Sequence, residues 1–532
     1  MGPGPDGELA PAGLRLRPDP GSRLLAGGTV LAGGYPARVL RLTPAGAREV
    51  TGWWSGTPVP DNPRARALAR RLIDAGIAHP VPSGSGLPGD VTVVVPVRDR
   101  QAELGRCLAG LRHLPRVIVV DDASADPAAV ARVAAGTGAR VLRREVNGGP
   151  GAARNTGLAA AQTELVAFLD SDCVPAPGWL DRLLPHFTDA AVGAVAPRIV
   201  PAGNSRTWLA RYEGASSTLD MGARASIVRP GSRVPYVPGA ALVVRKTAAG
   251  AGFAEDMRVG EDVDFVWRLA ASGWRVRYEP GAVVPHQHRV RLGSWFARRK
   301  DYGTSAAALE LRHPGAVCPL YVSGWTALAW LAAASGRPAA GVAVTGAATA
   351  LLARRLARLT GEPWPRPTTG TAWLLAARLA GGGTLRAGRP LGSAMSRTWW
   401  PVAIPAAIAV PRLRLPLAGL VLAPPLLDWL DRRPPLDPAR YVAARLLDDI
   451  GYSLGVWQSC VQRRTIRPLL PVLTDRHLDS PRVKSAGRMM SSGDRSLIED
   501  RPSASIVESI PPRSTSKTFF TPAEPLAARP HR

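Results

Sequence analysis

The chain has 532 residues and carries 67 Lys and Arg against 41 Asp and Glu, which gives a formal net charge of +26. Hydrophobic residues make up 46% of it, and its mean hydropathy is near zero. This balance excludes a wholly disordered chain and a small disulfide-stabilised protein, and it leaves a multidomain soluble protein or one with a membrane-embedded part. The positive charge is not concentrated in a recognisable nucleic-acid-binding module, so we expect no nucleic-acid partner.

The cysteines and the N-terminus indicate in which cellular compartment the protein is found. The four cysteines stand far apart, with no CxxC pair and no His at the spacing of a zinc site, so the sequence indicates neither disulfides nor structural zinc. The first ten residues lack the basic and apolar regions of a signal peptide. We therefore expect a reducing compartment and no secretion.

Residues 1–85 are predicted to form a small N-terminal module. Short apolar runs alternate with turn residues there, residues 23–34 are typical of a β-hairpin, and residues 65–76 have the apolar spacing of an amphipathic helix. A stretch rich in Pro, Gly and Ser at 80–89 then predicts a linker.

Residues 90–300 are predicted to form an α/β domain with a Rossmann-like sheet. Four short runs rich in β-branched residues are typical of buried parallel strands, and helical patterns separate them. The runs are 91–95, 117–120, 140–142 and 165–169.

Residues 310–470 are predicted to be hydrophobic, helical and membrane-associated. The apolar stretches 316–335 and 338–353 could form a helical hairpin with Arg337 at its far turn, and residues 399–427 favour either a span or an interfacial helix. Basic clusters at the open ends of the hairpin predict that the α/β domain faces the cytoplasm. The alternative is a buried core of Ala-rich helices. From residue 475 the tail lacks apolar periodicity, which predicts disorder.

Polar side chains follow several predicted strands. Pro96 and Arg98 follow the first, Asp122 ends the second, and Asp170 and Asp172 follow the strand at 165–169. Because ligands of open α/β sheets bind beyond the carboxyl ends of the strands, these residues are candidates for substrate binding. The two carboxylates of the DxD tripeptide could share Mg²⁺ or Mn²⁺ with a diphosphate, since hard cations prefer oxygen ligands. The alternative is an ordinary solvated turn.

A glycine-rich segment at 147–157 is predicted to open a helix. Its glycines would allow a phosphate to approach the helix N-terminus closely, and Arg154 and Asn155 lie in its first turns. The alternative is a glycine turn that only starts a helix.

Glu261 and Asp262 begin a second predicted helix, over 261–270, whose apolar residues recur at helical spacing. Carboxylates in a first turn commonly just complement the helix dipole. They can also project into a cleft as a general base. Farther along, a predicted strand ends at His286 and His288, either of which is a candidate metal ligand or phosphate partner, the alternative being an ordinary exposed histidine.

Five ordered motifs carry a resemblance to a known family. They are VVVPVRDR from 93, VVDDAS at 119–124, GGPGAARNTG at 148–157, FLDSD at 168–172 and GEDVDFVWRL at 260–269. Over residues 90 to about 291 the chain resembles the family 2 glycosyltransferases of GT-A fold. The resemblance implies that Asp122 binds the uracil of a UDP-sugar donor, that Asp172 binds the metal, and that Asp170 lies near the donor ribose or sugar.

The same resemblance implies that Asp262 is the catalytic base, with Glu261 beside it. The required chemistry agrees, because a metal ion and Arg154 would neutralise the leaving diphosphate while a carboxylate takes the proton of the acceptor hydroxyl. Attack from the face opposite UDP would invert the anomeric centre and give a β-glycoside.

Two segments of the N-terminal module indicate a smaller group within this family. Residues 31–46 and 68–80 resemble the N-terminal region of the mycofactocin biosynthesis glycosyltransferases. That family is similar in its order of parts: a winged-helix-like α+β module, a glycosyltransferase domain and hydrophobic helical segments. The resemblance to that family implies that the enzyme adds β-1,4-linked glucose to premycofactocin, a peptide-derived precursor of a redox cofactor. The alternatives are a polyprenyl-linked or cell-wall glycan acceptor, and a non-catalytic module that binds nucleotide and peptide.

Overall fold

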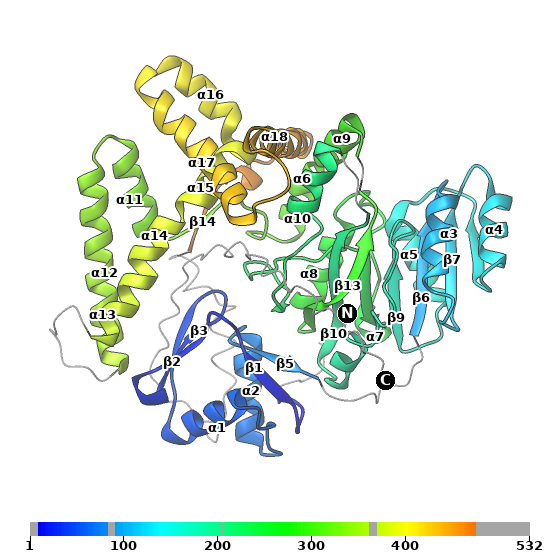
Figure 1. The fold of residues 1–532 in the computed structure, drawn as a ribbon, viewed down its shortest axis with the longest axis horizontal. Coiled ribbons are helices and arrows are strands. Elements are labelled where there is room, and N and C mark those ends of the chain that lie inside the picture. Colours follow the sequence, from blue (N-terminus) through cyan, green and yellow to red (C-terminus); the bar gives the residue numbers. More distant parts are fainter. Residues whose placement is uncertain (1–8, 83–90, 204–206, 289, 361–369, 475–532) are drawn as a thin grey trace, which may run out of the picture.

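The computed structural model describes residues 9–82, 91–203, 207–288, 290–360 and 370–474. Figure 1 shows three parts: an N-terminal module, a sheet flanked by helices, and a helical region with two projecting hairpins. Most of the predicted linker and all of the predicted disordered tail lie outside the described residues.

The N-terminal module combines two small sheets with two helices. Strands β2, β3 and β4 form an antiparallel sheet, and β1 pairs with β5. Asn62 caps α2 through its side chain, and the buried apolar face of α2 fills the module core. The predicted hairpin and helix are therefore confirmed. The elements are β1 (Arg15–Pro18), β2 (Arg23–Leu25), β3 (Val30–Gly33), β4 (Arg38–Arg41), α1 (Pro44–Trp54), α2 (Pro63–Asp74) and β5 (Ala78–Val81).

An eight-stranded mixed sheet forms the centre of the molecule, in the order β11-β13-β10-β12-β9-β6-β7-β8. The four predicted strands are confirmed, and they pair in parallel as β9, β6, β7 and β8. Antiparallel β12 joins them to the rest. The strands are β6 (Val91–Val97), β7 (Val117–Asp122), β8 (Arg140–Arg144), β9 (Leu165–Leu169), β10 (Val192–Pro201), β11 (Ser226–Ile227), β12 (Ala241–Arg245) and β13 (Arg275–His286).

Helices cover both faces of this sheet. Val93 and Val95 of β6 face one core with α3 and α4, while Val94 faces a second core with α5 and α8. The carboxyl ends of β6, β7 and β9 lie at one edge of the sheet, near the starts of α5 and α8. The helices are α3 (Gln101–Ala109), α4 (Pro127–Ala135), α5 (Gly149–Ala160), α6 (Trp208–Ser216), α7 (Lys246–Ala249) and α8 (Glu261–Ala271).

The C-terminal region packs on the sheet domain through α18 and α9. Gly303 of α9 lies so close to α18 that an added Cβ would come within 2.1 Å of the Tyr452 carbonyl, so the backbones approach closely at these glycines. The main helices are α9 (Leu292–Thr304), α10 (Ala306–Arg312), α11 (Gly324–Ala334), α12 (Pro338–Thr360), α13 (Thr371–Ala376), α14 (Gly382–Arg386), α15 (Gly388–Ala394), α16 (Trp400–Ala409), α17 (Arg414–Arg432) and α18 (Pro438–Gln462).

The prediction of one apolar helix over 316–335 is wrong. Helix α11 begins only at Gly324, after the Ser323 cap, because Tyr321–Val322 forms strand β14 and pairs with β15 (Val472–Leu473). The predicted hairpin turn at Arg337 is confirmed, with Gly336 at a φ of +80°. Within the described residues one helical stretch, Pro411–Arg432, has the length and composition to cross a membrane.

The N-terminal module contacts both other parts of the chain. Ion pairs join Arg70 to Asp189 and Asp19 to Arg233 of the sheet domain. Apolar side chains of β3 and β4 pack on α12 and α13. The module is therefore positioned to form one wall of the edge where the strands end.

Candidate active site

A cavity of about 1570 Å³ lies at the carboxyl edge of the sheet. Tyr35 and Pro36 of the N-terminal module and Arg397 and Tyr452 of the helical region also line it. The structure brings all but one of the sequence-predicted residues to this cavity. Those that line it are Pro96, Arg98, Asp122, Arg154, Asp170, Asp172, Glu261, Asp262, His286 and His288.

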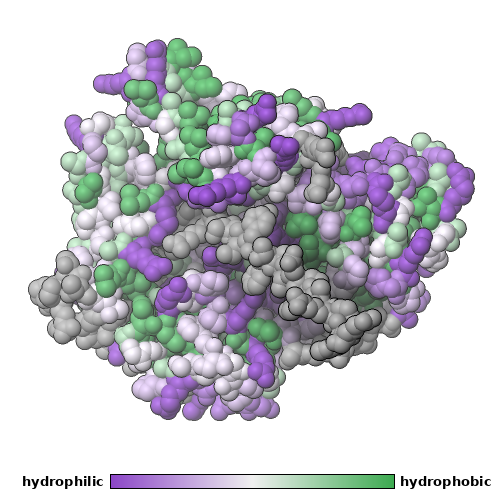
Figure 2. All heavy atoms as spheres, in the orientation of Figure 1, coloured by the Kyte–Doolittle hydropathy of each residue, from purple (hydrophilic) through white to green (hydrophobic). Residues whose placement is uncertain are grey.

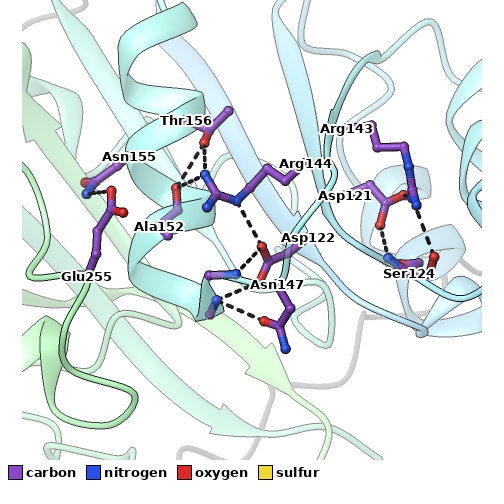
Figure 3. Close-up of polar contacts among 12 residues, drawn as sticks. Asp121, Asp122, Ser124, Arg143, Arg144, Asn147, Ala152, Asn155, Thr156 and Glu255 are labelled. Carbon is purple, nitrogen blue, oxygen red and sulfur yellow. Dashed lines mark hydrogen bonds and ion pairs between the residues drawn. The ribbon is translucent and has the colours of Figure 1, made fainter.

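Asp122, at the end of β7, holds the start of α5. Its carboxylate accepts hydrogen bonds from the backbone N–H groups of Gly148 and Gly149 at 3.0 and 2.8 Å and from Arg144 Nε at 3.0 Å (Figure 3). Gly149 has a φ of +85°, a conformation that favours glycine. The glycine-rich segment thus fixes the orientation of Asp122 at the cavity.

Asn155 is the predicted residue that does not line the cavity. Its side-chain amide donates to Glu255 at 2.9 Å (Figure 3). It also donates to the Phe253 carbonyl at 2.9 Å, and its oxygen accepts from the Phe253 N–H. Its hydrogen bonds therefore hold the loop before α8 against α5. The structure gives Asn155 a positioning role in place of the predicted contact with a nucleotide-sugar.

Arg154 joins the end of β9 to the start of α8. Its two terminal nitrogens donate to Asp170 Oδ1 and to Glu261 Oε1, each at 2.7 Å, and its side chain is almost fully buried. Such charge-assisted hydrogen bonds are strong because solvent is excluded. Arg154, predicted to meet a diphosphate, instead has its guanidinium charge balanced by these two carboxylates and positions both of them.

Asp172 is the carboxylate best placed to hold a cation. Its Oδ2 accepts from Arg100 at 2.5 Å, while its buried Oδ1 lies 3.3 Å from His286 Nε2 without a well-directed hydrogen bond. Burial raises the pKa of Asp172, but His286 and Arg100 outweigh this effect and hold the pKa well below its usual range. The side chain is therefore ionised.

Two side chains of the cavity could hold Mg²⁺ or Mn²⁺. No group of three or more His, Cys, Asp or Glu side chains with the arrangement of a metal site occurs in the part of the chain that is described. Asp170, predicted to share the cation, faces Arg154. Asp172 Oδ1 and the His286 imidazole nevertheless fit as two ligands, and a bound diphosphate would supply further oxygens.

Asp262 and Glu261 have different environments although they are adjacent. Asp262 faces the cavity. Its two oxygens accept hydrogen bonds from the backbone N–H groups of Gly239 and Val263, at 2.7 and 2.8 Å. Glu261 is buried against Arg154. Burial and the charge of Asp262 raise the pKa of Glu261 to about 7, even though Arg154 acts in the opposite direction. Asp262 is thus the carboxylate available to a substrate.

The raised pKa of Glu261 predicts a pH-dependent stability. Because the folded pKa of about 7 lies above the unfolded value of 4.5, Glu261 contributes most to stability below pH 4.5 and loses that contribution as pH rises through 7. Relative to Glu261→Gln, the free energy of unfolding should fall by up to about 3 kcal/mol across this interval. Urea unfolding of both proteins at a series of pH values measures the difference, and parallel pH profiles would contradict the assignment.

The sequence interpretation missed several residues at the cavity. Arg100, which lines the cavity and contacts Asp172, follows a strand and could have been found by the same reasoning as Arg98, and Arg144, which contacts Asp122, is the last residue of β8. Arg397 and Tyr452 come from distant helices, where the Arg397 guanidinium lies 3.9 Å from the Tyr452 ring centre. No local pattern marks this second pair.

Known proteins match either the glycosyltransferase domain alone or most of the chain. The sequence model of glycosyl transferase family 2 matches residues 92–249. The pre-mycofactocin glycosyltransferase of Mycobacterium tuberculosis is 42% identical over 471 residues, which cover 87% of this chain and 98% of that protein. The succinoglycan biosynthesis protein ExoU of Rhizobium meliloti is 32% identical over 36% of this chain and 59% of its own length.

Solved structures of glycosyltransferases are also similar. The mannosyltransferase of Pyrobaculum calidifontis, solved with GDP-Man and Mn²⁺, has a TM-score of 0.35 and 23% identity, covering 57% of this chain and 89% of its own. Glucosyl-3-phosphoglycerate synthase of Mycobacterium tuberculosis, with Mn²⁺ and UDP-glucose, has a TM-score of 0.30 and 22% identity, covering 42% and 79%.

The identity to the mycobacterial protein extends through all three parts of the chain, well beyond the glycosyltransferase domain. The N-terminal module and the helical region, which both line the cavity, are therefore shared features. The chain is a family 2 glycosyltransferase of GT-A fold, and it belongs to the pre-mycofactocin glycosyltransferase family.

Proposed function

We propose that this enzyme transfers glucose from UDP-glucose to premycofactocin with inversion, and builds a short β-1,4-linked oligosaccharide. The observation that carries the proposal is the 42% identity over 98% of the pre-mycofactocin glycosyltransferase. The cavity adds support, because a positioned carboxylate, Asp262, lies in it together with Asp122 and Asp172. The identity of the donor, the stereochemistry of transfer and the length of the product are all parts of this proposal.

The donor would lie along the carboxyl edge of the sheet. Asp122, held by Gly148 and Gly149, would accept from the N–H of uracil, as the family resemblance implies. Asp170, fixed by Arg154, would lie beside the ribose or the sugar. The sugar would then extend toward the start of α8.

Asp262 would act as the general base. The acceptor hydroxyl gives its proton to the Asp262 carboxylate while its oxygen forms the bond to the anomeric carbon, and the bond from that carbon to the diphosphate oxygen breaks to release UDP. The N–H groups of Gly239 and Val263 orient the carboxylate. A divalent cation held by Asp172 and His286 would neutralise the charge of the departing diphosphate.

Removal of divalent cations is expected to abolish transfer. EDTA should lower the rate by at least about 100-fold, because the charge of the diphosphate would no longer be balanced, and Mn²⁺ should restore it. Asp172→Asn should raise the Mn²⁺ concentration needed for half-maximal rate, whereas the exposed Asp181→Asn should leave it unchanged. Full activity in EDTA would contradict the role of Asp172.

The same proposal places the enzyme on the cytoplasmic face of the cell membrane. Large apolar side chains such as Leu331, Ile408 and Leu415 are exposed by 68, 69 and 85% on α11, α16 and α17. Figure 2 shows hydrophobic residues gathered over the projecting α16 and α17. Apolar helices of this kind insert into a bilayer interface. Fractionation of cells should recover the chain with membranes, and recovery in the soluble fraction alone would contradict this placement.

A competition between acceptors tests the proposed substrate. Labelled UDP-glucose is incubated with the full chain, purified premycofactocin and a membrane lipid extract in one reaction. Label in premycofactocin is expected. The exposed apolar helices favour a polyprenyl-linked acceptor as the second candidate, and label confined to the lipid fraction would establish that candidate instead.

A further inference from the structure

A second and larger cavity lies between α6 and the helices α14, α15 and α17. It encloses about 2290 Å³, and its lining residues include ten arginines and three aspartates. Arg397 and Tyr452 line both this cavity and the active-site cavity, so the two adjoin there. Such an excess of arginine in a hollow with apolar walls indicates an anionic ligand.

Part of the arginine charge is already balanced. Arg198 forms an ion pair with Asp220, and Arg389 forms one with Asp431. Asp449 forms ion pairs with both Arg397 and Arg445. Among the described residues, four arginines of this cavity have no carboxylate partner: Arg211, Arg224, Arg432 and Arg433. Asp428 is the lining carboxylate for which no ion pair is found among those residues. The cavity wall therefore keeps a positive charge.

Three of these arginines lie at the seam between α6 and the end of α17. Arg432 donates to the carbonyl of Ala215, and Arg211 donates to the carbonyl of Pro435 at 3.3 Å. Arg433 follows directly and ends α17 in a left-handed conformation, with φ of 43°. All three arginines line the cavity, and a guanidinium group that donates to one carbonyl keeps further N–H donors.

Between Arg414 and Asp428 the side chains of α17 are apolar. Leu420, Leu427 and Leu430 line the cavity together with the Trp330 ring, on the same helix that ends at Arg432. The exposed Leu415 continues the apolar surface toward α16. A ligand that lies along α17 from Leu415 toward Arg433 thus contacts apolar side chains first and guanidinium groups last, which is the order of an acyl chain and a phosphate in one membrane leaflet.

We propose that this cavity binds one anionic phospholipid of the membrane. The phosphate lies at the seam of Arg211, Arg432 and Arg433, which donate hydrogen bonds to its oxygens, and an acyl chain lies against Leu420 and Leu427. Guanidinium groups match phosphate geometry and supply charge that a zwitterionic lipid does not fully require. The site is independent of the acceptor and would place the active-site cavity beside the bilayer surface.

Native mass spectrometry of the full chain in a non-ionic detergent tests the proposal. Dioleoylphosphatidylglycerol, dioleoylphosphatidylcholine and inorganic phosphate are titrated separately. We expect one tightly bound phosphatidylglycerol, with affinity lowered about tenfold or more by R432Q/R433Q. Leu427→Asp should lower the same affinity through the acyl-chain contact. The matched control is R112Q/R132Q, which removes two exposed arginines of the sheet domain and should change nothing.

Three results would overturn the proposal. These are equal binding of the zwitterionic lipid, equal effects of the two double variants, and binding of inorganic phosphate that R432Q/R433Q abolishes while phosphatidylglycerol binding persists. Binding of UDP by each variant shows whether the protein is folded, since none of the changed residues lines the active-site cavity. Retained UDP binding with lost lipid binding is the expected pattern.

Discussion

Asp262→Asn is expected to lower kcat by about 1000-fold, because the amide cannot take the proton from the acceptor hydroxyl. The substitution keeps the size of the side chain and its acceptor oxygen, so a hydrogen bond from the Gly239 N–H can remain. The affinity for UDP should be unchanged, since the proposed arrangement of the donor puts Asp262 beyond the nucleotide. Initial rates and calorimetric UDP titrations of the same preparations measure both quantities.

Asp256→Asn is the matched control. It removes a carboxylate from the loop just before α8, where Asp256 is 67% exposed and pairs with Arg312 on the surface. Its kcat should stay within about twofold of the unaltered enzyme, because an exposed ion pair contributes little. A kcat near normal in Asp262→Asn would show that Asp262 is not the base. Glu261 would then be the next candidate.

Arg154→Gln is expected to lower the free energy of unfolding by about 3–5 kcal/mol, because it leaves a buried carboxylate without its partner. Arg154 is the cation that faces both Asp170 and the buried Glu261. Transfer should also fall, by at least about 100-fold, because neither carboxylate keeps its position at the cavity. Urea unfolding and initial rates measure the two effects.

A double variant separates charge compensation from catalysis. Arg154→Gln combined with Glu261→Gln removes the uncompensated buried charge and should recover most of the lost stability, while transfer stays low because Asp170 still lacks its partner. Arg98→Gln, an exposed arginine of the same cavity, should leave stability unchanged. Additive stability losses in the double variant would contradict the coupling of Arg154 to Glu261.

The central sheet and most of the candidate site were predictable because their signals are local. Runs such as 91–97 are buried on both faces, so their β-branched residues form an uninterrupted pattern. Parallel strands that share an edge then bring Asp122, Asp170 and Asp172 together without further information. The glycines at 148–149 also identified the start of α5, where the backbone N–H groups bind Asp122.

The remaining features depend on contacts between distant residues. Arg154 and Asn155 are neighbours on α5, yet one faces Glu261 and the other faces Phe253, and composition does not distinguish these directions. Among the apolar residues at 316–322, Tyr321 and Val322 form a short strand because a partner at 472–473 is available. The contribution of Arg397 and Tyr452 to the cavity likewise depends on how α18 packs against α9.

The direct test of the proposed function is a mass spectrum of the acceptor after reaction. The full chain is incubated with premycofactocin, UDP-glucose and Mn²⁺, and NMR of the product assigns the anomeric configuration. The account predicts that premycofactocin gains successive hexose units in β linkage, and that no unit is added by Asp262→Asn. Premycofactocin of unchanged mass, or a product with α linkage, would contradict it.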